Sequence, residues 1–114
     1  MDDLTSAAII KALDSLSMRQ AYTAQNIANA GSPGYKAMRV TFEDSLRAAA
    51  SEGVQAIRDV APQAEADPAA SSSGVRLDLE LATAAQTAKR YSALVELLSR
   101  QMALRHALVT EGKR

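Results

Sequence analysis

The sequence predicts an all-α protein in which two long terminal amphipathic helices form a coiled coil on assembly. Near both ends of the 114-residue chain, apolar residues recur at alternating spacings of four and three, which is the repeat of a coiled-coil stripe. A Ser-Pro-Gly sequence at 32–34 stops the first of these patterns, because a proline and the residue before it both disfavour continued helix. A turn motif and a flexible low-complexity middle are expected to join the two helices.

These features divide the chain into four expected segments. They are an N-terminal helical assembly segment (1–30), a turn motif with a short extended or helical piece (31–47), a flexible variable middle (48–76) and a C-terminal helical assembly segment (77–114). Alanine supplies much of the apolar content and only four residues are aromatic. Because alanine buries little area, we expect a thin core in the isolated chain.

The first helix is expected from about Leu4 to Asn29. Its stripe contains Ile9, Leu13, Leu16, Gln20, Thr23 and Ile27. The stripe is narrow and has polar residues at its centre, so it is typical of a helix that packs against one neighbour. The apolar members Ile9, Leu13, Leu16 and Ile27 are therefore candidate assembly-interface residues.

The turn that follows can be interpreted residue by residue. Asn29 or Gly31 could adopt the left-handed backbone that ends many helices, and Ser32 is displaced from helical geometry by the following proline. Pro33 and Gly34 suit the two central positions of a type II turn, where proline presets the first φ and glycine accepts the positive second one. The helix must end here.

The centre of the chain carries weaker signals. Met38, Val40 and Phe42 alternate over a short extended piece, and Thr41 with Asp44 resembles a capping box that opens a short helix. Residues 48–76 sustain no period and are rich in Ala, Ser and acidic residues, which is unusual inside a compact domain. We expect a flexible or partner-ordered middle; the alternative is a surface loop with a short helix near 54–60.

The second long helix is expected from about Leu79 to Glu111. One of its stripes contains Ala84, Ala88, Tyr91, Val95, Leu98, Met102, Arg105 and Val109, and a second contains Leu94, Leu97, Leu104 and Leu108. Together the stripes cover about half of the helix circumference at 100° per residue, more than one partner helix can bury. The candidate interface residues here are Tyr91, Leu94, Val95, Leu98, Met102 and Leu108.

The composition argues against catalysis and against several partner classes. The chain has no cysteine and one histidine, His106, so no thiolate site, histidine pair or nucleophilic triad is available. We expect no enzyme activity, no cofactor and no metal. Thirteen basic and 13 acidic residues balance, and the basic residues are scattered, so we expect neither nucleic-acid binding nor direct lipid binding.

Between the two helical segments, one motif resembles a known family. The residues Asn26-x-Ala28-Asn29-x-x-Ser32-Pro33-Gly34-Tyr35-Lys36, placed just after the first helix, look like those of the axial proteins of the bacterial flagellum, the rod and hook components. The family motif usually has threonine where Ser32 stands. Within the family, the small size and the tail from Tyr91 favour a rod component. The resemblance covers both ends of the chain and not its middle.

This resemblance implies a structural subunit of the flagellar basal body that carries torque. Its partners would be other rod proteins, the rod/ring adaptor, copies of itself and the flagellar type III export apparatus. It would lie in the rod on the periplasmic side. The sequence begins without a basic region followed by an apolar run, so we expect export without a cleaved signal peptide.

Overall fold

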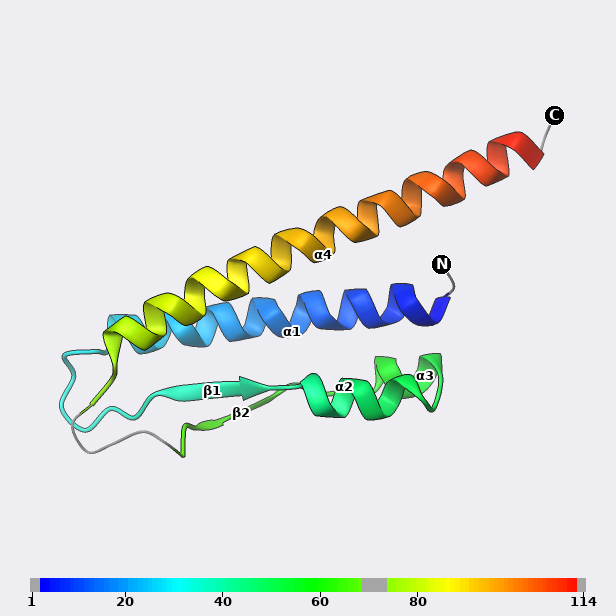
Figure 1. The fold of residues 1–114 in the computed structure, drawn as a ribbon. Helices are drawn as coiled ribbons and strands as arrows, with labels where there is room; N and C mark the ends of the chain where they lie inside the picture. The colour runs from blue at the N-terminus through cyan, green and yellow to red at the C-terminus, as the bar shows by residue number, and fades with distance from the viewer. Residues whose placement is uncertain (1–2, 69–73, 113–114) are drawn as a thin grey trace.

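The computed structural model describes residues 3–68 and 74–112 and shows a mostly helical, elongated molecule with extents of 65 × 26 × 13 Å (Figure 1). The elements follow one another as α1 (Asp3–Ala28), β1 (Met38–Thr41), α2 (Glu43–Ala50), α3 (Val54–Arg58), β2 (Gln63–Ala66) and α4 (Leu77–Gly112). Helix α1 forms the middle layer. Helix α4 lies along one side of it, and the strands with the two short helices lie along the other (Figure 1).

The two long helices predicted at the ends of the chain are present, and they pack against each other in antiparallel directions. Near the end of α1, Gln20 Nε2 donates a hydrogen bond to the Ala84 carbonyl at 3.1 Å. At the other end of the pair, Arg105 bonds to Asp3 at 2.9 Å. The α1 stripe is therefore covered by α4 and the central elements of its own chain.

The expectation of an all-α fold is confirmed only in part: the described chain is mostly helical, but β1 and β2 form a two-stranded antiparallel sheet. Its register pairs Met38 with Ala66 and Thr41 with Gln63. The alternation at 38–42 has a physical cause: Val40 and Phe42 are buried together with Leu16 of α1. The partner strand, Gln-Ala-Glu-Ala, has few residues with high strand propensity, so the sequence pattern did not reveal it.

The segment 48–76, expected to be a flexible middle, contains the end of α2, all of α3 and strand β2. The helix Val54–Arg58 corresponds to the alternative of a short helix near 54–60. Ile57 has 0% of its surface exposed and clusters with Ala49 and Val60 against the start of α1. Isolated apolar residues thus anchor this segment without a repeating pattern. Residues 69–73 of it lie outside the described residues.

The predicted capping box at the start of α2 is not formed. The residue at the N-cap is Phe42, and no side chain caps the helix. Helix α2 begins at Glu43, whose carboxylate is instead bound by Arg19 of α1. A long-range charge pair therefore replaced the local interaction that the sequence pattern suggested.

Candidate assembly site

The motif that follows α1 forms a turn stabilised by its own side chains. Asn29 Nδ2 donates to the Gln25 carbonyl at 2.9 Å, and Ser32 Oγ donates to Asn29 Oδ1 at 3.2 Å. The Tyr35 amide bonds to the Ser32 carbonyl at 3.3 Å, which closes a turn around Pro33 and Gly34. Gly34 has φ +77°, as the predicted type II turn requires.

The predicted left-handed helix end is not observed at Asn29 or Gly31. Among the described residues only Gly34, Gly53 and Gly74 have positive φ. Helix α1 ends instead by a tightened turn in which the Ala30 amide bonds to the Ile27 carbonyl at 3.2 Å. Such three-residue turns satisfy terminal carbonyls without a left-handed residue.

The buried centre of the motif is Asn26, whose exposed fraction is 1%. Its Nδ2 donates to the Met38 carbonyl at 2.8 Å and to Glu80 Oε2 at 3.1 Å. Its Oδ1 accepts from the Met38 amide at 2.9 Å and from the Tyr35 hydroxyl at 2.8 Å. An amide side chain has two N–H donors and two lone pairs, so the hydrogen-bonding capacity of Asn26 is filled. One residue of α1 thereby holds β1 and α4; we call this the Asn26 junction.

Tyr35 is held in its protonated form at this junction. Burial raises the pKa of its hydroxyl above the ordinary value, and the negative charge of Glu80 and the neighbouring Tyr22 raise it further. The neutral hydroxyl is the form that can donate to Asn26 Oδ1. The other motif residues are more accessible: Asn29 is half-buried, and Ala28, Ser32, Pro33, Gly34 and Lys36 are exposed. The motif therefore has a buried anchor and an outer surface.

A second polar anchor, which sequence reasoning missed, lies two turns earlier on α1. The Arg19 guanidinium donates two hydrogen bonds of 2.7 Å to the Glu43 carboxylate. Its Nη2 also donates a hydrogen bond of 2.7 Å to the Val40 carbonyl. It stands 4.8 Å from the centre of the Phe42 ring. Only 16% of the Arg19 side chain is exposed. Paired, bidentate guanidinium–carboxylate contacts of this kind are the stronger ion pairs of proteins.

The Arg19–Glu43 pair changes the titration of the carboxylate. The hydrogen bond from Arg19 holds the pKa of Glu43 below its ordinary value, aided by backbone N–H groups and by the positive charge of Arg19, while burial opposes the shift. No spacing rule links residues 19 and 43, so only their placement on α1 and at the start of α2 brings them together. The pair fixes where the chain leaves β1.

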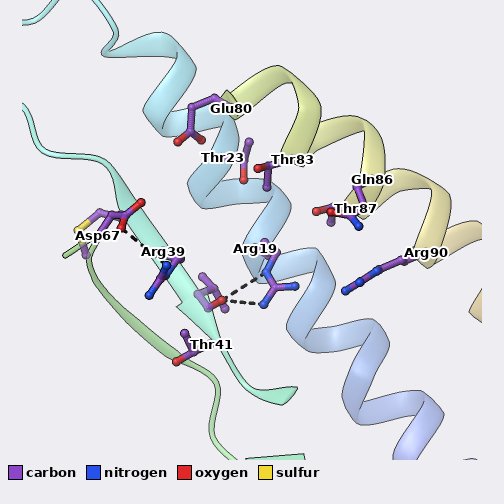
Figure 2. A pocket seen from close by; sticks show the side chains of 12 residues that line it. Arg19, Thr23, Arg39, Thr41, Asp67, Glu80, Thr83, Gln86, Thr87 and Arg90 are labelled. Carbon is purple, nitrogen blue, oxygen red and sulfur yellow. Dashed lines mark hydrogen bonds and ion pairs between the residues drawn. The ribbon is translucent and has the colours of Figure 1, made fainter. Parts of the chain in front are cut away.

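A polar groove of about 330 Å³ lies between β1 and α4, with α1 as its floor (Figure 2). On the strand side Arg39 lies 3.7 Å from Asp67, and from α4 Arg90 reaches Glu43 at 3.6 Å. Threonine and glutamine side chains of α4 line the far wall. Its cations are matched by nearby carboxylates, and no histidine or cysteine lines it. The geometry is that of a polar contact between elements.

The described ranges, 3–68 and 74–112, contain no group of three or more His, Cys, Asp or Glu residues placed to hold a metal ion. Within the same ranges, no helix is both long enough and apolar enough to cross a membrane. The single histidine, His106, is exposed on α4.

The predicted interface residues fall into two groups. Ile9 and Leu16 are buried within the chain, and Leu13 and Ile27 of α1 are half-buried. On α4, Leu94 and Leu98 are half-buried. The exposed group consists of Tyr91 (40%), Val95 (41%), Met102 (63%) and Leu108 (60%). The structure therefore uses the α1 stripe for its own core and leaves the α4 stripes open for other contacts.

Replacing Asn26 by Asp tests the junction. The change removes the amide that donates to Met38 and Glu80, and it brings a second carboxylate beside Glu80. We expect a loss of about 2 to 4 kcal/mol in the free energy of unfolding, because buried acceptors lose their donor and like charges meet. Urea denaturation followed by circular dichroism measures this loss. Asn29→Asp is the matched control, and an equal loss in both variants would contradict a special role for Asn26.

The Glu43 pKa predicts a specific dependence of stability on pH. Because the folded-state pKa is lowered, Glu43 stabilises the fold above its unfolded pKa, and this contribution disappears as pH falls through the folded-state value. Wild type should therefore be more stable than Glu43→Gln at pH 7, and the difference in urea midpoint should shrink as the solution is acidified below the ordinary value of 4.5. A difference that stays constant into strong acid would show that the charge of Glu43 does not contribute.

Comparisons with known proteins do not identify the chain: no family model matches it, and no curated relative is found. The resemblance of its motif and tail to flagellar axial proteins stays a hypothesis.

Proposed function

We propose that the chain is a structural subunit of the bacterial flagellar basal body, located in the proximal rod on the periplasmic side. In this proposal it resembles FlgB, the basal-body rod protein at the proximal end of the rod. It is exported by the flagellar type III apparatus and assembles with other rod proteins, the rod/ring adaptor and its own copies. The assembled helices form the drive shaft that transmits torque for motility.

The observation that carries the proposal is the Asn26 junction. Asn26, the first residue of the stretch that resembles the axial-family motif, joins the end of α1 to β1 and to the first turn of α4 and also binds Tyr35 of the same stretch. A sequence that served only to end a helix would not need a buried side-chain amide with all of its hydrogen bonds made. In a rod subunit, such a junction would set the angle at which both terminal helices meet the neighbouring subunits.

The open surface of α4 is the second support. Exposed large apolar side chains recur along its distal half, from Val95 to Val109. Contiguous apolar surface is uncommon on a soluble monomer and is typical of interaction sites. The proposal assigns these side chains to coiled-coil contacts between subunits, where neighbours would bury the distal half of α4 that the core of the isolated chain does not reach.

Two other assignments use the same features differently. Another rod protein or a rod adaptor of the same family would share the motif and differ in its neighbours. A cytoplasmic helical binding module or chaperone would use the open face of α4 for one soluble partner and would have no need of the Pro33-Gly34 turn. The location of the chain separates this last class from the rod proteins.

Mass spectrometry of detergent-purified hook-basal bodies from the source organism tests the location. The chain should be retained in the particle at a level comparable with other rod components, and a cytoplasmic fraction provides the comparison. A chain found only in the cytoplasm while the rod assembles normally would favour the binding module.

The double substitution Pro33→Ala with Gly34→Ala tests the turn. Alanine at position 34 would be strained at φ +77°, so the exit from α1 should shift while synthesis continues. We expect loss of swarming and of assembled rods, measured by motility plates and basal-body yield. Gly31→Ala is the matched control, because Gly31 has no positive φ and no atom within 4 Å of an added Cβ. Normal motility in the double variant would count against the proposal.

A further inference from the structure

We propose that the free chain forms a symmetric dimer in which the distal half of α4 packs antiparallel against α4 of a second copy. The pairing concerns the protein before it meets other partners, and it does not require that the chain enter a rod. It uses one flank of α4, called here the leucine flank, which contains Leu94, Leu97, Gln101, Leu104 and Leu108.

The leucine flank has the spacing and exposure of an unfilled helix seam. Its members are separated by three and four residues in alternation, which keeps them on one side of the helix. Leu97, Leu104 and Leu108 are 40%, 51% and 60% exposed. Helix α4 has 36 residues and α1 has 26, and α4 diverges from α1 toward its C-terminal end (Figure 1). The described part of the chain thus leaves Leu97, Leu104 and Leu108 open, while Leu94 and Gln101 are half-buried.

An apolar groove lies at one end of the leucine flank, and the exposed Leu108 side chain at the other end could enter that groove on a second copy. An apolar groove of about 330 Å³ opens beside Leu94 and is lined by Ala12, Leu16, Phe42, Glu43, Arg90, Ala93 and Leu94. Leu108 lies 14 residues further along α4, or about 21 Å at 1.5 Å per residue. In an antiparallel pair centred on Gln101, Leu108 of one copy comes level with Leu94 of the other. Each copy then places a leucine at the groove of its partner.

The other leucines of the flank also pair with each other when the two helices are centred on Gln101. Leu97 comes level with Leu104 of the second copy, because their midpoint lies within half a residue of Gln101. Arg90 and Glu111 share that midpoint, so opposite charges meet at both ends of the seam. A two-fold axis requires this kind of self-complementarity, in which one patch contacts its own copy. Charge and shape therefore favour a second copy as the occupant.

The size of the seam sets the expected strength. The exposed side chains amount to a few hundred Å² on each copy, on the order of the largest patches of ordinary monomers. A pair of such surfaces buries less than the roughly 1,200 Å² at which specific, stable interfaces begin. The dimer should accordingly be reversible, and it should form with rising concentration between the micromolar and millimolar ranges.

Sedimentation analysis of the full-length chain provides the first test. With increasing concentration the mass should rise from 12.1 kDa toward twice that value. Leu108→Glu should weaken dimerisation at least about tenfold, because it would bring a charged side chain to the apolar groove beside Leu94 of the second copy. Val109→Glu is the matched control: Val109 is 59% exposed, next in sequence, and part of the other apolar stripe, about 100° away around the helix. A wild-type monomer at all concentrations, or a dimer weakened by Val109→Glu and not by Leu108→Glu, would overturn the pairing.

Thiol crosslinking tests the direction of the helices, since the chain has no cysteine of its own. In the antiparallel pair, Leu97→Cys and Leu104→Cys should each crosslink poorly alone and efficiently when mixed under mild oxidation. A parallel pair would give the reverse, with strong crosslinks in each variant alone, and would contradict the proposal. Circular dichroism of each variant checks that the helices remain formed.

Discussion

The placement of the two long helices depends on one buried side-chain amide, that of Asn26, whose hydrogen bonds must all be made inside the protein. Asn26 is almost fully buried in a chain whose apolar core is small, and a buried polar group is stable only when its partners are in place. Met38, Tyr35 and Glu80 supply these partners from the strand, the turn and α4. Their positions are therefore coupled through α1. Arg19 repeats the arrangement by binding β1 at Val40 and α2 at Glu43.

These two polar anchors compensate for a core that is divided into small clusters. One cluster contains Leu16, Val40 and Phe42, and the other contains Ala49, Ile57 and Val60. Neither cluster reaches the distal part of α4, where the exposed apolar residues lie. A short chain of this kind orders its proximal part by itself and leaves its longest helix dependent on neighbours for burial. The proposed roles, in a rod and in a free dimer, follow from the same imbalance.

The sequence predicts structure best where apolar residues repeat at a fixed spacing or where one residue type is needed for an unusual backbone angle. The long helices follow from repeats at three and four residues, and the turn follows from the positive φ that Gly34 accepts. The sheet could not be predicted, because β2 is polar and alanine-rich and pairs with a strand more than twenty residues away. The sequence singles out the turn that follows Asn26, but it does not reveal the contacts that Asn26 makes. The pairing of Arg19 with Glu43 carried no local signal at all, since charged residues at a distance in sequence reveal their partners only when packing places them together.

Hydrogen exchange of the full-length chain measures the coupling through Asn26 most directly. The Met38 amide bonds to Asn26 Oδ1, and Asn26 also bonds to Glu80 in the first turn of α4. If the junction is one unit, Asn26→Ala should accelerate exchange in β1, β2 and the first turns of α4 together, while α3 keeps its protection. Faster exchange confined to Met38, with the start of α4 unchanged, would show that the strand and the long helix are held independently and would contradict this account.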